Sequence, residues 1–162
     1  MRRTIMLLAT MALTVLLATG VALAVEKTCQ ANTDCFGTIQ ADTLTGSSGA
    51  DRIYGLGGSD IISGLGGADD LSGGSGTDEV NGGAGGDLIN GAGGADDIRG
   101  GGDIDEIRAG NGDDTVIGGG GNDEIVVNGD QDAGFQDEVF CQGDEDVVSA
   151  DPNDILHDCF LA

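Results

Sequence analysis

Aliphatic residues recur at a fixed spacing of nine between Gly46 and Val126. Each follows an Asp by two residues, and a glycine-rich stretch separates one group from the next. Most of them are β-branched, which favours strands, and alternate residues of a strand face opposite sides. The pattern predicts a short strand in every unit, with these aliphatic side chains turned inward: Ile53, Ile62, Leu71, Val80, Ile89, Ile98, Ile107, Val116 and Ile125.

The polar positions follow the same period. Position one of the nine-residue unit is Gly except at Ala109, and position four is Gly except at Asp103. Weaker copies flank the block: 37–45 keeps Asp42 and Leu44, and 127–135 keeps Asp132 but has Gly134 at the aliphatic place. The sixth position is always Asp, at Asp51, Asp60, Asp69, Asp78, Asp87, Asp96, Asp105, Asp114 and Asp123.

This repeat, G-G-x-G-x-D-x-U-x with U aliphatic, resembles the RTX (repeats-in-toxin) calcium-binding β-roll family. The resemblance is strict over 46–126, about half of the chain. It implies an all-β fold, a right-handed parallel β-roll (β-solenoid) in which two repeats complete one coil. It also implies that the six-residue turns bind Ca²⁺ and that the three-residue segments around each aliphatic residue form the strands.

The residue types suit calcium. Ca²⁺ takes six to eight oxygen ligands from carboxylates and backbone carbonyls, and tight turns of inward-facing carbonyls need the positive φ angles that glycine reaches. We therefore expect the metal ligands to be the nine position-six Asp residues named above. Turn glycines complete the expected set: Gly55, Gly57, Gly64, Gly66, Gly73, Gly82, Gly91 and Gly118.

Turns on one side of such a roll recur every two units. One column of turns then contains Asp60, Asp78, Asp96 and Asp114, and the other contains Asp51, Asp69, Asp87, Asp105 and Asp123. With ions between consecutive turns, we expect about seven Ca²⁺ as the cofactor. The apolar core is thin for so glycine-rich a chain, so we expect the metal-free protein to be largely unfolded.

Two departures bear on individual turns. Asp103 and Ile104 make unit 100–108 the least regular, although Asp tolerates left-handed backbone better than most residues. Leu56 and Leu65 stand at position two, where we expect Gly57 and Gly66 beside them to keep the glycine count of the turn.

The N-terminus carries a targeting signal. Arg2 and Arg3, an apolar run over 5–17 and the sequence Ala-Leu-Ala at 22–24 predict a secretory signal peptide over 1–24. An uncleaved membrane anchor is the rival interpretation, since 5–24 is just long enough to span a bilayer. We expect cleavage, a mature chain beginning at Val25, and a secreted, extracellular protein.

The net negative charge of the chain excludes two classes of binding partner. The chain has a net charge of −23, and without Arg2 and Arg3 four basic residues face 29 acidic ones, giving −25. Such a chain repels nucleic acid and anionic lipid. We expect calcium ions as partners, no nucleic acid, no membrane after signal cleavage, and a monomer. The sequence identifies no protein or polysaccharide partner.

Four cysteines in an oxidising compartment favour two disulfides. Coils stacked about 4.8 Å apart separate the two ends of the roll by roughly 20 Å, whereas a disulfide joins Cα atoms only about 4.4–6.8 Å apart. The pairing should be Cys29 with Cys35 and Cys141 with Cys159.

Solenoids need atypical end units, so we divide the chain into four parts: signal peptide 1–24, N-terminal cap and degenerate repeat 25–45, nine repeats 46–126, and degenerate repeat and C-terminal cap 127–162. Within the last part, 142–146 is either one more acidic turn or a solvated loop. Its hydrophobic residues are expected to plug the last coil: Val139, Phe140, Val147, Val148, Ile155, Leu156 and Phe160.

No catalytic constellation stands out. His157 is the one histidine, and the nearby cysteines that could help it bind zinc are expected in a disulfide. Paired carboxylates such as Asp69 and Asp70 lie in calcium turns, so we expect no enzyme. The alternative function is a calcium-stabilised extracellular adhesion or matrix component, although the outward strand positions carry neither a threonine ladder nor an aromatic platform.

Overall fold

The computed structural model describes residues 24–127, 135–142 and 145–161, and there the ordered elements are strands. The strands are β1 (Glu26–Thr28), β2 (Asp34–Phe36), β3 (Thr43–Thr45), β4 (Arg52–Gly57), β5 (Ile61–Gly66), β6 (Asp70–Ser75), β7 (Glu79–Ala84), β8 (Leu88–Gly93), β9 (Asp97–Gly102), β10 (Glu106–Asn111), β11 (Thr115–Gly120), β12 (Glu124–Val126), β13 (Glu138–Phe140), β14 (Val147–Ser149), β15 (Ile155–His157) and β16 (Phe160–Leu161).

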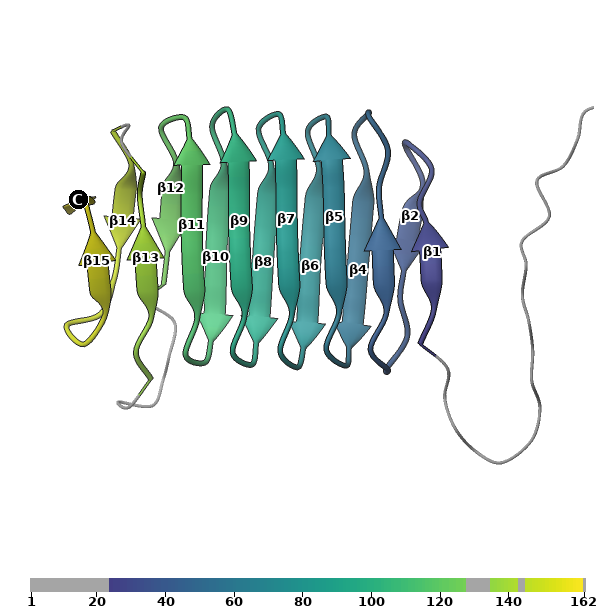
Figure 1. Ribbon diagram of the computed structural model, residues 1–162, viewed down its shortest axis with the longest axis horizontal. Helices are drawn as coiled ribbons and strands as arrows, with labels where there is room; N and C mark the ends of the chain where they lie inside the picture. The colour runs from purple at the N-terminus through teal and green to yellow at the C-terminus, as the bar shows by residue number, and fades with distance from the viewer. Residues whose placement is uncertain (1–23, 128–134, 143–144, 162) are drawn as a thin grey trace, which may run out of the picture.

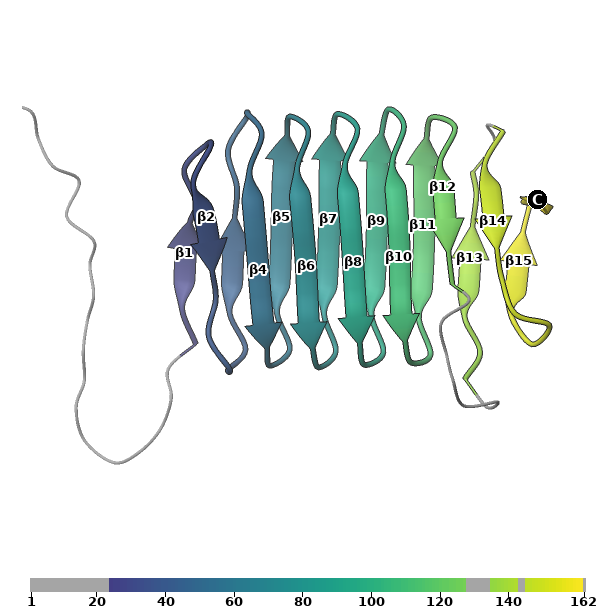
Figure 2. The same ribbon diagram turned by 180° about the vertical axis from the view of Figure 1, so that it is seen from behind.

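These strands form two parallel sheets that lie face to face (Figures 1 and 2). Odd-numbered strands make one sheet and even-numbered strands the other, so the chain changes sheet at every turn. In the repeat block the register joins residues two units apart, as in Ile62 with Val80 and Ile53 with Leu71. The predicted all-β parallel solenoid, with two repeats per coil, is confirmed.

The core is a double row of aliphatic side chains between the sheets. All nine predicted residues are at most 1% exposed, and Leu44 extends the row toward the N-terminus. Position-one residues, Gly55 and Ala109 among them, are also buried. This narrow interior explains why the unit alternates one large and one very small inward residue.

The strands of the repeat block are longer than predicted. β4 to β11 each span six residues, because the ladder continues past the aliphatic residue into the glycine-rich stretch. Leu56 pairs with Gly74 and Gly57 with Ser75, so the first half of each turn is strand. The expectation of three-residue strands holds in β1 to β3 and in β12 to β15.

The turns themselves use left-handed backbone at positions two and four. Gly94 shows why glycine is needed at position four, since a β carbon there would lie 1.6 Å from the carbonyl oxygen of Gly76 in the preceding coil. Asp103 occupies this position with φ 72°, so its turn survives as expected.

Leu56 and Leu65 hold the left-handed position of their turns themselves. They adopt φ angles of 79° and 73° themselves, whereas Gly57 and Gly66 are not left-handed. The neighbouring glycines therefore do not take over the left-handed position. Both leucine side chains are about half exposed, so the turn accepts them by pointing them into solvent.

Both expected disulfides are present at the ends of the roll. Cys29 and Cys35 have their Cα atoms 5.6 Å apart, and Cys141 and Cys159 have theirs 5.2 Å apart. The first loop closes the end formed by β1 and β2, and the second joins segments at the opposite end (Figure 1).

The C-terminal segment is not a separate plug, because β13 to β16 extend both sheets. Val139 pairs with Val116 and Val148 pairs with Ile125, and both new valines are buried. Val147 and Ile155 point outward and are 49% and 41% exposed. The segment therefore adds coils of the same kind instead of covering the last one.

Some expectations fall outside the described residues. The signal peptide lies there except for Ala24, and so do Asp132 and Gly134 of the degenerate copy. Among the residues that are described, the structure contains no helix long and apolar enough to cross a membrane.

Candidate metal centre

Each sheet has a column of buried aspartates along one edge, with one Asp directly before each strand from β3 to β14. We call Asp42, Asp60, Asp78, Asp96, Asp114 and Asp137 the odd-sheet column, and Asp51, Asp69, Asp87, Asp105, Asp123 and Asp146 the even-sheet column. Every member is at most 3% exposed. The nine predicted aspartates thus lie in the two columns that the period of the sequence implied.

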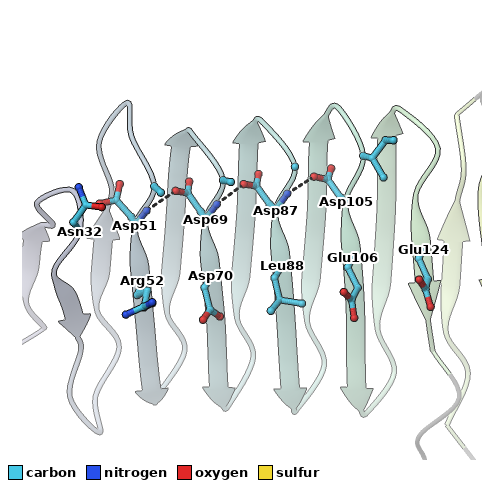
Figure 3. A pocket seen from close by; sticks show the side chains of 14 residues that line it. Asn32, Asp51, Arg52, Asp69, Asp70, Asp87, Leu88, Asp105, Glu106 and Glu124 are labelled. Carbon is cyan, nitrogen blue, oxygen red and sulfur yellow. Dashed lines mark hydrogen bonds between the residues drawn. The ribbon is translucent and has the colours of Figure 1, made fainter.

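Backbone hydrogen bonds hold each column together. From Asp42 to Asp123, the amide of every column Asp donates to Oδ1 of the Asp in the next coil, at 2.8 Å from Asp60 to Asp78 and 2.9 Å from Asp69 to Asp87. Figure 3 shows this chain of bonds from Asp51 to Asp105. The same bond orients every carboxylate after the first of each column, so one oxygen of each of these Asp residues is used in the same way along the stack.

The second carboxylate oxygen is left without a donor in the interior of both columns. Oδ2 is buried and has no hydrogen-bond partner in Asp60, Asp69, Asp78, Asp87, Asp96, Asp105 and Asp146. An unsatisfied buried acceptor of this kind is destabilising, and more so when it is charged. A column of such oxygens fits a cation, which would satisfy them.

Position-one glycines make room for these oxygens. A β carbon at Gly55 would lie 2.3 Å from Asp60 Oδ2 and 2.3 Å from the carbonyl oxygen of Gly73 in the next coil. At Gly64 the corresponding distances are 2.3 Å to Asp69 Oδ2 and 2.6 Å to the carbonyl oxygen of Gly82. The absent side chain therefore leaves a space that a carboxylate oxygen and a carbonyl oxygen share.

The glycines predicted as ligands do not all have the same neighbours. Gly73, Gly82, Gly91 and Gly118 lie beside the Asp of their own unit, as Gly55 and Gly64 do. Gly57 and Gly66 instead face Ser75 and Ala84 of the next coil. The role of all these glycines as ligands stays a prediction.

Burial raises the pKa of the column carboxylates from Asp60 to Asp105. It raises the pKa of Asp69 and of Asp96 to about 6, and that of Asp105 to about 7. Backbone amide bonds partly offset the shift, and neighbouring aspartates add to it. The pKa of Asp60 is raised for the same first reason. Negative charge in these columns lacks compensation, and a bound cation would provide it.

Side chains alone do not form a cage. In the described parts of the chain, no three His, Cys, Asp or Glu residues come together in a group that could hold a metal ion. A cation in these turns would need backbone carbonyls for most of its six to eight oxygens. Calcium accepts such a mixed oxygen set, and this agrees with the ligands expected from the sequence.

An open groove of about 800 Å³ runs along the even-sheet column. Asp51, Asp69, Asp87 and Asp105 lie along one side of it, as Figure 3 shows. The exposed row of Arg52, Asp70, Leu88, Glu106 and Glu124 lies along the other. The groove gives solvent ions a path toward the buried carboxylates from an acidic surface.

Sequence reasoning missed Asp137, and it covered Asp146 only within 142–146, which was left as either an acidic turn or a solvated loop. The structure favours the acidic turn, and Asp137 and Asp146 are the last members of the two columns. Each lies 23 residues beyond the Asp whose amide it accepts, Asp114 and Asp123, instead of the usual 18. The longer spacing shifts them out of phase with the repeat block, although the two remain nine residues apart. A shorter signal was present, because both stand two residues before a buried valine, Val139 and Val148 in turn.

Fold and site together define a parallel β-roll whose turns present buried carboxylates and carbonyls to a cation. A comparison with protein families matches the RTX calcium-binding nonapeptide repeat (4 copies) at residues 36–71, 72–107 and 99–133, more than half of the chain. The chain belongs to this family, so it is a calcium-binding β-roll protein. Comparisons with curated proteins and with solved structures found no match.

Proposed function

We propose that this chain is a secreted protein whose β-roll forms as it binds several Ca²⁺ ions in its glycine- and aspartate-rich turns. The observation that carries the proposal is the row of buried Oδ2 atoms without donors in both Asp columns. A fold with so many unsatisfied acceptors is stable only when something positive reaches them.

Each part of the turn has a task in this proposal. The Asp amide and Oδ1 set the spacing between coils, and Oδ2 with the turn carbonyls holds the ion. Bound calcium would supply the positive charge that the columns lack. Position-one glycines keep the space open, so we assign ligand roles to the nine position-six aspartates and the predicted glycines, with about seven ions as the expected number.

Secretion fits this chemistry. Extracellular calcium modules have dissociation constants of roughly 10⁻⁴–10⁻³ M, far above calcium concentrations inside cells. The apolar run at 5–17, which we assign to a cleaved signal peptide over 1–24, and the two disulfides support an extracellular location. The chain would then stay unfolded until it meets calcium outside the cell.

The test is a calcium titration of the purified, oxidised protein, followed by circular dichroism and by calorimetry. We expect a cooperative gain of strand structure as calcium rises into the millimolar range, with several ions bound per chain. Magnesium should do much less, because it demands rigid octahedral geometry. A chelator-treated sample that is as ordered and heat-resistant as the calcium-loaded one would refute the proposal.

A matched pair of substitutions locates the ions. Asp96→Asn alters a buried column member, and we expect it to lower the number of bound ions and the cooperativity. Asp34→Asn makes the same chemical change at the surface, where the side chain is 51% exposed and pairs with Arg52. A surface ion pair contributes little, so Asp34→Asn should titrate like the unmodified protein. Equal titrations for both variants would contradict the Asp column as the ligand set.

Adhesion to a polymer or cell surface is the second candidate. One feature of the described surface favours it: Phe36 and Tyr54 stack on the outside of the roll with ring centroids 5.2 Å apart, and Phe36 is 49% exposed. A pull-down from envelope or matrix material, with and without calcium, separates the two functions. Calcium-dependent capture that Phe36→Ala abolishes would establish adhesion, and no capture would leave calcium binding alone.

A further inference from the structure

The first turn of each column differs in sequence from all later turns. Position two of the unit is Thr38 in the odd-sheet column and Ser47 in the even-sheet column. The later units carry residues without a hydroxyl there, and each of these is left-handed, with φ from 73° to 121°: Leu56, Leu65, Gly74, Gly83, Ala92, Gly101, Gly110 and Gly119. Thr38 and Ser47 are not left-handed, so these two turns also follow a different backbone path.

The hydroxyl group of each residue binds the carboxylate of its own unit. Thr38 donates to Asp42 Oδ2 from its amide at 2.6 Å and from Oγ1 at 2.9 Å. Ser47 donates to Asp51 Oδ2 from its amide and from Oγ at the same two distances. The oxygen that lacks a donor in the interior turns therefore has two donors in the first turn of each column.

Asp42 is the more complete case. Its Oδ1 accepts the amide of Val25 at 2.8 Å, so both carboxylate oxygens are satisfied. Asp51 lies at the start of its column, where no earlier Asp donates, and its Oδ1 has no partner. Asn32 lies beside it on that side in Figure 3. At Oδ2, however, both carboxylates accept the same two hydrogen bonds, one from an amide and one from a hydroxyl group.

We propose that Thr38 and Ser47 take the place of calcium in the first turn of each column, so that the calcium sites begin at Asp60 and Asp69. This inference rests on the proposed function. A cation at Asp42 or Asp51 would have to displace two hydrogen bonds to a charged acceptor, which are stronger than bonds between neutral groups. It would also have to bind a turn that lacks the left-handed position-two residue found in the later units of the repeat block.

Asp51 thereby leaves the set of proposed ligands, and the expected ion count changes in one column. The odd-sheet sites expected from Asp60 onward are unaffected. In the even-sheet column the ion expected between Asp51 and Asp69 is removed, which leaves about three of about four. Six Oδ2 atoms without donors remain in the repeat block, at Asp60, Asp69, Asp78, Asp87, Asp96 and Asp105.

The experiment counts bound calcium at saturation, by calorimetry on the purified, oxidised protein and four Asp→Asn variants. Asp42→Asn and Asp51→Asn should keep the ion count of the unmodified protein. Asp60→Asn and Asp69→Asn, the matched controls one coil later, should each lose about one ion. Loss of an ion in Asp42→Asn or Asp51→Asn would overturn the inference.

Removing the hydroxyl groups of Thr38 and Ser47 should have the opposite effect and increase the number of bound ions. Thr38→Gly and Ser47→Gly remove the hydroxyl donor and permit the left-handed backbone, so each should gain about one ion. Thr38→Ser and Ser47→Thr keep the hydroxyl and should leave the count unchanged. If the glycine variants gain no ion, the hydroxyl is not what excludes calcium and the inference is wrong.

A crystal structure of the calcium-loaded protein tests the inference without any substitution. It should show ions on Asp60 Oδ2 and Asp69 Oδ2, and hydroxyl groups on Asp42 Oδ2 and Asp51 Oδ2. An ion on Asp42 Oδ2 or Asp51 Oδ2 would overturn the inference alone. Failure of the unmodified protein to bind any calcium would instead overturn the proposed function.

Discussion

The repeat block and the C-terminal coils are built on the same two ladders but from different sequences. Between them the Asp ladder continues without a break, as the amide of Asp114 bonds to Asp137 Oδ1 at 2.8 Å. The aliphatic ladder continues too, from Val116 to Val139. These two ladders are therefore sufficient to extend the sheets when the period of nine is lost.

The two regions differ in what surrounds the ladders. β4 to β11 span six residues because their glycine-rich ends continue the pairing, whereas β13 to β15 span three. The C-terminal coils have instead a disulfide between Cys141 and Cys159. We conclude that glycine-rich turns serve the ion and that the last coils depend more on a covalent link.

The largest effect is expected from breaking that link with Cys141→Ser together with Cys159→Ser. Removing a native disulfide from a small secreted domain typically costs about 2–5 kcal/mol of stability. Hydrogen exchange of the calcium-loaded protein should show lost protection in β13 to β16, while β4 to β11 remain protected. Calorimetry should still find the ions of the repeat block.

The same hydrogen-exchange experiment can contradict the proposed difference between the repeat block and the C-terminal coils. If the disulfide variant loses protection uniformly along the roll, the coils unfold as one unit and calcium does not hold the centre separately. The N-terminal pair, Cys29→Ser with Cys35→Ser, is the matched control and should affect β1 and β2 while leaving β13 to β16 protected.

A smaller effect should follow from filling the space beside one carboxylate in the repeat block. Gly55→Ala places a β carbon 2.3 Å from Asp60 Oδ2 and from the carbonyl oxygen of Gly73. Overpacking of this kind costs about 1–3 kcal/mol, and the oxygens that move are proposed calcium ligands. Thermal unfolding in calcium should show a lower midpoint, and calorimetry should show weaker binding.

Gly93→Ala is the control for that substitution. Gly93 lies in the same kind of turn, but a β carbon there would have nothing within 4 Å and its φ is not left-handed. Its stability should change by no more than about 0.5 kcal/mol. If Gly55→Ala is equally neutral, the position-one glycine is not required by the carboxylate beside it.

The period of nine explains how much the sequence could predict. It predicted the two sheets, the buried aliphatic row and the two Asp columns, because every unit repeats the same local choice of strand and turn. It also predicted the disulfides, since the length of the roll keeps its ends apart. Strand length was underestimated because glycine gives no propensity signal for the pairing of Leu56 with Gly74 and Gly57 with Ser75.

Two other features depend on individual contacts that periodicity does not encode. Asp137 was missed, and the turn of Asp146 was left open, because five extra residues displace both from the phase of the repeat, although each keeps its spacing to a following valine. Thr38 and Ser47 look like ordinary variation at position two. Their hydrogen bonds to Asp42 and Asp51 become visible only when the backbone path is known.

Acidity offers the mildest way to compare the regions, because it changes no atom of the backbone. Burial raises the pKa of Asp105 to about 7 and those of Asp69 and Asp96 to about 6, from an ordinary value of 3.8. A raised folded-state pKa means that the fold binds protons more tightly than the unfolded chain does. Protons therefore stabilise the metal-free fold fully below pH 3.8, and this contribution is lost as the pH rises through about 6 to 7.

Calcium and protons then compete for the same carboxylates. As the pH falls from 8 to 5, the calcium concentration for half-saturation should rise. Near pH 8 the number of ions bound at saturation should stay constant. In chelator, strand content by circular dichroism should increase over the same fall in pH. A calcium midpoint that does not move between pH 8 and 5 would show that the buried aspartates are not the groups that bind the ion.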